Sequence, residues 1–141
     1  MRTRVLFVCT ENSSRSQMAE GFLRHLGGDD FEALSAGAEP TSVNPLAVEV
    51  MKEVGIDISG QRAKDVSDFL GQNFQYLIRV CDRVRERCPV LPGAVWYLDW
   101  SFEDPATAAG AAAERLAVFR RIRDDIEKRI AEFIAAPPVR S

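Results

Sequence analysis

The sequence predicts an α/β domain built in three layers, with a four-stranded parallel sheet between helices on both of its faces. Four short apolar runs have the composition of strands that are buried on both sides, and amphipathic helical stretches alternate with them. This alternation is typical of parallel sheets, because parallel neighbours need a crossover connection. The length of 141 residues suits one hydrophobic core, so we expect a single domain over residues 1–136 and a loose tail over 137–141.

Strands and helices alternate in the first half of the chain. Residues 5–8 form a continuous apolar run, which indicates a buried strand, and an apolar repeat at steps of four begins after Ser16 and ends at a pair of glycines. Residues 31–38 are expected to form a second strand. Asn44 and Pro45 then supply an N-cap followed by proline at the first helical position, which predicts a second helix.

The second half of the chain predicts a short helix, two strands and one long helix. Residues 66–70 are the expected short helix, and the apolar runs 76–80 and 95–98 are the expected strands. From residue 111 apolar side chains recur at steps of three and four on one face, and this helix is expected to continue almost to Pro137.

The composition excludes several classes of protein. The net charge is −3 and the pI is near 5.2, and a mildly acidic chain lacks the basic face that nucleic-acid binding needs. No apolar run approaches the roughly 18 residues that a membrane span requires, and the run near the N-terminus is too short for a signal peptide. We therefore expect a cytoplasmic protein that binds neither nucleic acid nor a membrane. No surplus apolar stripe stands out, so a monomer is expected.

The chain contains three cysteines, at positions 9, 81 and 88. An odd number argues against a secreted domain held together by disulfides, and a chain with one histidine and no CxxC motif is a poor candidate for a zinc site. Cys81 and Cys88 are two helical turns apart, about 10 Å along a helix axis, whereas a disulfide needs Cα atoms within ~7 Å. A bridge between them would unwind a helical segment, so the pair is either a redox switch or two unrelated thiols.

The stretch VLFVCTENSSRS places a thiol at the end of a strand and an arginine shortly after it. Loop amides and the N-terminus of the following helix attract a tetrahedral oxyanion, and the planar fork of Arg15 can hold two of its oxygens. The same positive field favours the thiolate of Cys9, a nucleophile to which Ser16 can donate its hydroxyl. The alternative is a buried cysteine beside a surface arginine. The expected oxyanion-binding residues are Cys9, Thr10, Glu11, Asn12, Ser13, Ser14, Arg15 and Ser16.

The loop that follows the fourth strand carries three acids, Asp99, Glu103 and Asp104. Ligand sites of parallel sheets lie at the carboxyl ends of the strands. We therefore expect the loop over residues 99–104 to share one crevice with Cys9 and Cys81.

Three motifs carry a family resemblance. The string CTENSSRSQMAEG resembles the phosphate-binding loop of the low-molecular-weight tyrosine phosphatases and of the arsenate reductases that share their fold, and SQMAEG favours the reductase branch. VCDRVRERCPVLPG and WSFEDPA are similar to two further motifs of thioredoxin-coupled arsenate reductases. The resemblance runs from residue 5 to about residue 106 and implies a low-molecular-weight phosphatase-like fold.

The resemblance implies a three-cysteine relay that reduces arsenate to arsenite and so detoxifies it. Cys9 would attack arsenate held by Arg15, with Asp104 as the general acid. Asp99 and Glu103 are nearby acids that we rank below Asp104, as solvated or structural groups. Cys81 and then Cys88 would carry the disulfide outward to thioredoxin. No tightly bound cofactor is implied, and phosphate and sulfate are analogues of the oxyanion. Glutathione-linked and mycothiol-linked reductants remain alternatives to thioredoxin.

Two other functions compete with the reductase. A tyrosine phosphatase would hydrolyse aryl phosphates through a phosphoenzyme on Cys9, and a non-catalytic module would bind oxyanions or sense redox state without turnover. Cys81 and Cys88 distinguish the two enzymes, because hydrolysis needs neither thiol and reduction needs both.

Two features of the sequence concern charge near the loop. Glu11 stands where the family often has glycine, and we expect its carboxylate to point away from the anion. Asn12, Glu20 and Ser35 resemble positions at which some members of the family bind potassium, although a helix-surface glutamate such as Glu20 is more often solvated. No other metal site is expected.

Overall fold

The computed structural model describes residues 2–82 and 89–138. Its elements follow the predicted order, and several strands extend one or two residues beyond the predicted bounds. In chain order the elements are β1 (Thr3–Cys9), α1 (Arg15–Gly27), η1 (Gly28–Asp30), β2 (Phe31–Gly37), α2 (Pro45–Glu53), η2 (Val66–Phe69), β3 (Phe74–Arg79), β4 (Ala94–Asp99), η3 (Pro105–Thr107) and α3 (Ala112–Ala135).

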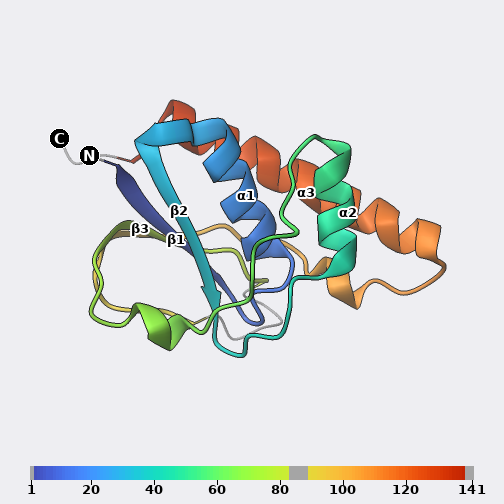
Figure 1. The fold of residues 1–141 in the computed structure, drawn as a ribbon, viewed down its shortest axis with the longest axis horizontal. Coiled ribbons are helices and arrows are strands. Elements are labelled where there is room, and N and C mark those ends of the chain that lie inside the picture. Colours follow the sequence, from blue (N-terminus) through green and yellow to red (C-terminus); the bar gives the residue numbers. More distant parts are fainter. Residues whose placement is uncertain (1, 83–88, 139–141) are drawn as a thin grey trace.

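The four strands form one parallel sheet in the order β2-β1-β3-β4. β1 pairs with β2 over its whole length, from Thr3 opposite Phe31 to Cys9 opposite Gly37. On its other side it pairs with β3, which in turn pairs with β4. The carboxyl ends of all strands therefore meet at one edge of the sheet, where β1 ends on Cys9 (Figure 1).

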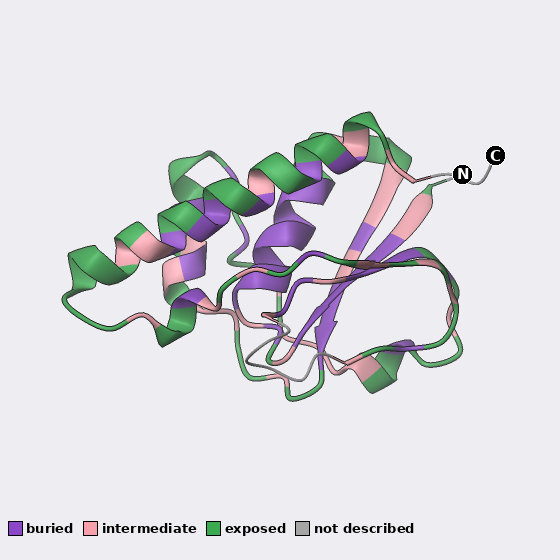
Figure 2. Ribbon diagram, turned by 180° about the vertical axis from the view of Figure 1, so that it is seen from behind, coloured by how far each residue is buried: buried purple, intermediate pink, exposed green. Residues whose placement is uncertain are grey.

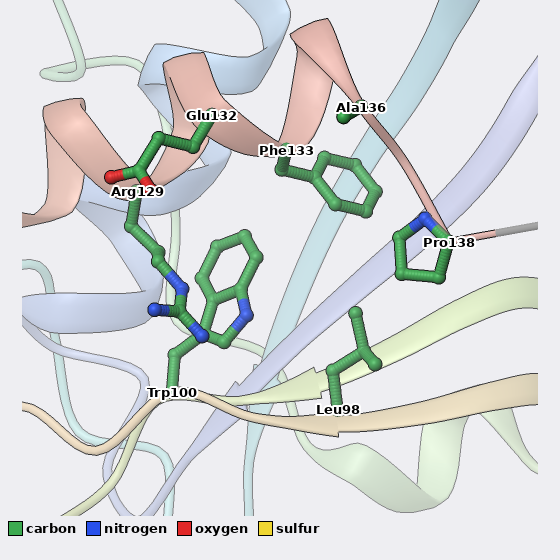
Figure 3. Close-up of a pocket in the computed structure, with 7 residues that line it drawn as sticks. All are labelled: Leu98, Trp100, Arg129, Glu132, Phe133, Ala136 and Pro138. Carbon is green, nitrogen blue, oxygen red and sulfur yellow. The ribbon is translucent and has the colours of Figure 1, made fainter.

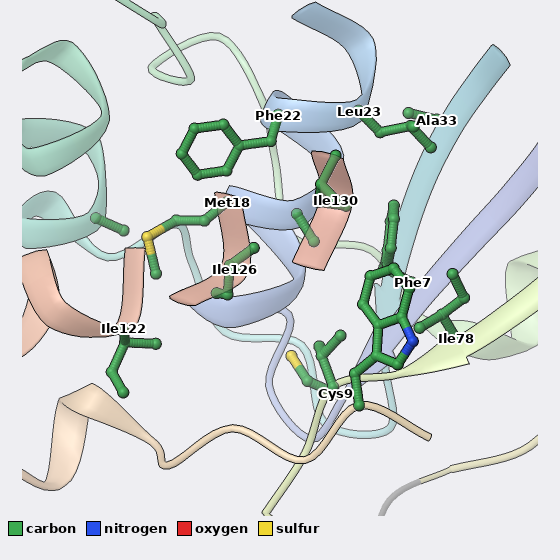
Figure 4. Close-up of a cluster of buried hydrophobic side chains, with 14 of the residues drawn as sticks. Phe7, Cys9, Met18, Phe22, Leu23, Ala33, Ile78, Ile122, Ile126 and Ile130 are labelled. Carbon is green, nitrogen blue, oxygen red and sulfur yellow. The ribbon is translucent and has the colours of Figure 1, made fainter. Parts of the chain in front are cut away.

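The three α-helices pack on one face of the sheet and share its larger hydrophobic core. Val5 and Phe7 of β1 belong to this core together with Met18 and Phe22 of α1. Figure 4 shows Phe7, Met18 and Phe22 in the cluster. Each helix turns one apolar stripe inward, and Figure 2 shows the buried stripe along α3. The core residues from α2 and α3 include Val50, Met51, Phe119, Ile122, Ile126 and Ile130.

The opposite face of the sheet is covered by η2 and the loops around it. Leu6 and Val8, which alternate with the side chains of the larger core, pack here against Phe69 of η2. The predicted α/β fold with four parallel strands is confirmed. The helical element on this second face is a 3-10 helix of four residues, at the place where the sequence predicted a short helix.

The C-terminal segment returns to the sheet after α3. The Tyr76 hydroxyl of β3 donates a hydrogen bond to the Pro138 carbonyl, so the second residue of the predicted tail contacts the fold. Positions 139–141 lie outside the described residues. Within residues 2–82 and 89–138, no helix combines the length and the apolar content that a membrane crossing requires.

A pocket of about 430 Å³ lies between the end of β4 and the last turns of α3 (Figure 3). Trp100 and Phe133 line it with ring centroids 5.6 Å apart, and the Arg129 guanidinium lies 5.3 Å from the Trp100 ring centroid. Trp100 also contacts Phe7, with 6.0 Å between ring centroids, so it acts here as a packing residue. This pocket shares no lining residue with the narrower one beside Cys9.

Candidate active site

Cys9 ends β1 and begins the loop that leads to α1. The residue is 2% exposed and carries a free thiol. The backbone N–H of Asn12 donates to Cys9 Sγ at 3.2 Å, and Ser16 Oγ lies 2.8 Å from the same sulfur. Cys9 also belongs to the larger core (Figure 4). The thiol thus lies at the boundary between the hydrophobic core and two polar groups, the Asn12 N–H and the Ser16 hydroxyl.

The direction of the Ser16 hydrogen bond follows from its neighbours. The backbone N–H of Lys64 donates to Asn12 Oδ1 at 2.9 Å, which fixes the orientation of the Asn12 amide. Asn12 Nδ2 therefore donates to Ser16 Oγ, 2.8 Å away. Ser16 thus keeps its own proton, which it can donate to Cys9 Sγ. The Cys9 sulfur therefore lies within hydrogen-bond distance of two donors, the Asn12 N–H and the Ser16 hydroxyl.

Asn12 forms the sharpest bend of the loop. Its φ of 52° is the one positive φ among the described residues other than glycine, and asparagine tolerates this conformation because its short side chain bonds locally. The bend presses against Gly37 at the end of β2, where an added Cβ would lie 2.7 Å from Asn12 N and 2.8 Å from Thr10 O. The loop therefore requires glycine at position 37.

Arg15 and Asp104 lie together, although they are far apart in the sequence. Arg15 is 4% exposed, and its Nη1 donates to the Phe102 carbonyl at 3.1 Å. Its Nη2 lies 3.6 Å from Asp104 Oδ2. Asp104 also caps η3, because its Oδ1 accepts the N–H of Ala106 at 3.0 Å. The guanidinium and the carboxylate are thus each anchored by a backbone group.

A narrow pocket of about 20 Å³ connects these groups. This volume is close to that of one water molecule, so the pocket suits a small ligand rather than a drug-sized one. Five of the eight predicted oxyanion-binding residues line it, while Asn12 and Ser16 act on the Cys9 sulfur. The lining residues are Cys9, Glu11, Ser13, Ser14, Arg15, Asp104 and Ala106.

Two side chains of the loop differ in their surroundings. Glu11 is exposed, and its carboxylate accepts a hydrogen bond from Thr41 Oγ1 at 3.3 Å. Ser14 is buried, and its hydroxyl has no hydrogen-bond partner among the described residues. Because a buried polar group without a partner is costly, the Ser14 hydroxyl is available to a bound oxyanion.

Cys81 lies next to the strand end that carries Cys9. The pairing of β1 with β3 continues past β3, since the N–H of Val80 donates to the Val8 carbonyl at 3.0 Å. Cys81 follows directly and is fully buried, with Sγ 3.9 Å from the same carbonyl oxygen. It takes part in a disulfide. Cys88, the third predicted relay cysteine, lies outside the described residues.

The two competing acids form ion pairs away from the pocket. Asp99 holds Arg79 in a bidentate pair, with Nε to Oδ1 at 2.5 Å and Nη2 to Oδ2 at 2.9 Å. Glu103 pairs with Arg121 at 3.0 Å on the exposed surface. Asp104 is therefore the one of the three acids that lines the pocket.

Residues 61–64, which we call the strap, also support the loop. Gln17 Nε2 donates to Asn12 Oδ1 and to the Arg62 carbonyl, each at 2.9 Å. Gln61 Nε2 donates to Gln17 Oε1 at 2.7 Å. Sequence reasoning missed the strap, and no motif marks it, because part of its contact with the loop runs through backbone atoms.

The positions that resemble a potassium site come together in part. Ser35 Oγ donates to Glu20 Oε1 at 2.6 Å, and Glu20 is 3% exposed, so it is not a solvated surface glutamate. The Asn12 side chain turns its Oδ1 to Lys64 and Gln17. Within the described part of the chain, no group of three or more His, Cys, Asp or Glu residues could hold a metal ion.

Comparison with known proteins identifies close relatives. The chain is 45% identical over 129 residues to an arsenate reductase of Shouchella clausii, a match that covers 92% of this chain and 93% of that protein. It is similar to the solved structure of an arsenate reductase in the phosphate-binding state, with a TM-score of 0.79, 38% identity, and coverage of 94% of this chain and 97% of that one.

A second solved structure and a family model agree with these matches. A thioredoxin-dependent arsenate reductase of Corynebacterium glutamicum matches with a TM-score of 0.73 and 31% identity, over 96% of this chain and 61% of that one. The family model for low molecular weight phosphotyrosine protein phosphatases matches residues 4–137. The chain therefore belongs to the low molecular weight phosphotyrosine phosphatase family, within its arsenate reductase branch.

Proposed function

We propose that this chain reduces arsenate to arsenite through a relay of Cys9, Cys81 and Cys88, with thioredoxin as the final reductant. The observation that carries the proposal is that two cysteines lie at neighbouring strand ends, Cys9 after β1 and Cys81 after β3. Hydrolysis of a phosphoenzyme would use the first cysteine alone. A second buried cysteine beside it supports a reaction that passes a disulfide from one sulfur to the next.

In the first step the Cys9 thiolate attacks the arsenic of arsenate bound in the narrow pocket. Arg15 holds two oxygens of the anion, and its burial strengthens that interaction. Asp104 gives a proton to the departing oxygen, which leaves as water, so that a bond between Cys9 Sγ and arsenic remains. The 3.6 Å between Arg15 Nη2 and Asp104 Oδ2 supports the binding of one small ligand by both groups.

In the second step the Cys81 thiolate attacks Cys9 Sγ. The electron pair of the sulfur–arsenic bond passes to arsenic, so arsenite leaves and a Cys9–Cys81 disulfide remains. The Cys88 thiolate then attacks Cys81 and releases the Cys9 thiolate. The dithiol of thioredoxin reduces the resulting Cys81–Cys88 disulfide and is itself oxidised, which restores all three thiols.

The relatives support the activity and the reductant. Similarity to an arsenate reductase covers 92% of the chain, and one similar structure is that of a thioredoxin-dependent enzyme. We include in the proposal a cytoplasmic location, because thiols stay reduced there, a monomeric state and the lack of a tightly bound cofactor. Phosphate and sulfate would bind as analogues, since they share the shape and charge of arsenate.

A coupled assay tests this proposal. Arsenate, thioredoxin, thioredoxin reductase and NADPH are supplied, and NADPH oxidation is followed for the wild type and for Cys88→Ser. We expect sustained oxidation by the wild type and about one turnover or less by the variant, because the disulfide can no longer leave Cys81. A wild type without arsenate-dependent oxidation would contradict the proposal.

A tyrosine phosphatase is the second candidate, which the family match over residues 4–137 favours. The same loop, arginine and acid would serve phosphoryl transfer, because they stabilise the same distribution of charge. Brisk hydrolysis of an aryl phosphate that is unchanged in Cys88→Ser, without arsenate-dependent NADPH oxidation, would establish this alternative.

A further inference from the structure

The oxygens at the positions that resemble a potassium site already have protein partners. Glu20 Oε2 pairs with Arg24 Nη2 at 2.7 Å, and Glu20 Oε1 accepts from Ser35 Oγ at 2.6 Å. Asn12 Oδ1 accepts from two N–H groups. A hard metal cation is held by several oxygen ligands at once. With the Lys64 and Arg24 cations beside Glu20, these residues therefore do not fit a potassium ion.

A cation of the protein itself lies at the same place. Lys64 Nζ is 3.5 Å from Glu20 Oε1 and donates to the Arg62 carbonyl at 2.8 Å. The Lys64 side chain is 17% exposed, whereas that of Arg24 is 56% exposed. Lys64 is thus the better shielded of the two cations that neutralise Glu20, and a charge pair is stronger where water is excluded.

We propose that the Lys64 ammonium is a built-in cation that positions the Cys9 loop, so that the reaction of this chain does not depend on a monovalent metal ion. Lys64 touches neither the pocket nor the sulfur, and it acts through Asn12 as a positioning residue. The inference rests on the proposed function, because it concerns the loop that binds the oxyanion there.

The connection from Lys64 to the nucleophile consists of three hydrogen bonds. Lys64 pairs with Glu20 through its side chain, and its backbone N–H donates to Asn12 Oδ1 at 2.9 Å. Asn12 Nδ2 donates to Ser16 Oγ at 2.8 Å, and Ser16 Oγ lies 2.8 Å from Cys9 Sγ. The anchored ammonium therefore fixes the amide that orients the hydroxyl on the thiolate.

Lys64 joins the strap both to β2 and to the buried carboxylate of Glu20 on α1. The Gly37 N–H donates to the Lys64 carbonyl at 2.9 Å, which joins the strap to the end of β2. Ser35 of β2 and Glu20 of α1 form their own hydrogen bond beside it. A buried charge that loses a partner is strongly unfavourable. Loss of the ammonium should therefore displace the strap and, with it, the loop.

The test compares the wild type with Lys64→Met and with the control Lys128→Met, which removes an exposed lysine on α3. Each protein is fully reduced and measured in potassium chloride and in tetramethylammonium chloride at equal ionic strength. The readout is the rate at which iodoacetamide alkylates Cys9, followed by peptide mass spectrometry. The wild type and the control should react at the same rate in both salts.

Lys64→Met should react about tenfold more slowly than the wild type in tetramethylammonium chloride, because the loop is no longer held. Potassium should restore much of the rate, since it is small enough to replace the ammonium beside Glu20, whereas tetramethylammonium is not. A purely structural defect would not distinguish the two salts. In the coupled assay the variant should lose kcat more than it raises KM, because Arg15 stays in place.

The double variant Glu20→Gln with Lys64→Met should lose less rate than Lys64→Met alone, since a neutral amide needs no cation. If circular dichroism shows that Lys64→Met does not fold, the double variant is measured in its place. A wild type that reacts more than about twofold faster in potassium overturns the inference, as does a Lys64→Met protein that reacts like the wild type in both salts. Alkylation needs no arsenate, so a failure of the proposed function would appear only in the coupled assay.

Discussion

The two loops that build the candidate site are held in different ways. The loop after β1 is partly buried, with Asn12 and Ser14 buried and Glu11 exposed, and it is braced by β2 and the strap. Asn12 of this loop and Ser16 at the start of α1 contact the Cys9 sulfur. The loop after β4 carries Asp104, whose side chain is 22% exposed and lies 3.6 Å from Arg15. The loop after β1, which is expected to hold the anion and the nucleophile, is therefore preorganised. Asp104, which is expected to transfer a proton, is in contact with solvent and can be reprotonated from it.

Removal of the nucleophile should have the largest effect, because both loops act on it. Cys9→Ser is expected to lower arsenate reduction and aryl phosphate hydrolysis by about a thousandfold or more, since a hydroxyl is a far weaker nucleophile than a thiolate. Both rates are measured on the purified variant. Phosphate binding, measured by calorimetry, should persist because the loop amides and Arg15 remain. Retention of more than about a tenth of either activity would show that Cys9 is not the nucleophile.

Arg15→Lys should have the second largest effect, and it probes the preorganised loop after β1. We expect kcat/KM for arsenate to fall about 100-fold, because an ammonium cannot hold two oxygens in a plane and loses the fixed hydrogen bond to the Phe102 carbonyl. Both kcat and KM should change. Arg121→Lys, at an exposed arginine that pairs with Glu103, is the matched control and should retain full activity. Equal behaviour of the two variants would remove Arg15 from the site.

Asp104→Asn probes the exposed loop and should separate proton transfer from binding. The amide can still cap η3 through its oxygen, as Asp104 does toward the N–H of Ala106, but it cannot give up a proton as an acid does. We expect kcat to fall about 100-fold, with phosphate affinity changed by less than about threefold. Glu103→Gln is the control for loss of a nearby charge. If phosphate affinity falls as much as kcat does, Asp104 contributes to anion binding as well as to proton transfer.

The sequence predicts the loop after β1 well because its signals are local. Cys9, Arg15 and the small residues between them are contiguous, and the apolar run before them fixes the strand on which they end. The proximity of Arg15 and Asp104 could be predicted only from a general rule, namely that the carboxyl ends of the strands of a parallel sheet share one edge. That rule holds because β1 and β4 are parallel members of the same sheet.

The supports of the loop could not be predicted, because they arise between segments that are distant in the sequence. Gly37 is required by a close approach of backbone atoms in the loop, and Lys64 acts partly through its own N–H. Neither leaves a pattern of residue types. Glu20 shows the same limit, since its helical position suggested a solvated carboxylate and the packing of β2 and the strap buries it.

A third region, the contact between α2 and α3, can separate fold stability from site chemistry. Glu53 pairs with Arg120 and with Arg123, each at 2.8 Å. The hydrogen bond from Arg120 is the main cause that lowers the pKa of Glu53 from 4.5 to about 2; Arg123 adds to it and desolvation opposes it. Because this pKa is lowered on folding, the pairing stabilises the fold above about pH 4.5, and the contribution is lost as the pH falls toward 2.

Glu53→Gln should therefore have the smallest effect, and only on stability. We expect a slightly lower free energy of unfolding than in the wild type at pH 7, since solvent-exposed ion pairs contribute little. Urea unfolding at a series of pH values should show this difference shrinking as the pH falls from 4.5 toward 2, where the carboxylate is protonated in both states. Arsenate reduction and Cys9 alkylation should not change, because Glu53 does not line the pocket. A constant difference between pH 7 and pH 3 would show that the two arginines do not set this pKa, and a loss of activity would show that the contact between α2 and α3 is coupled to the braced loop.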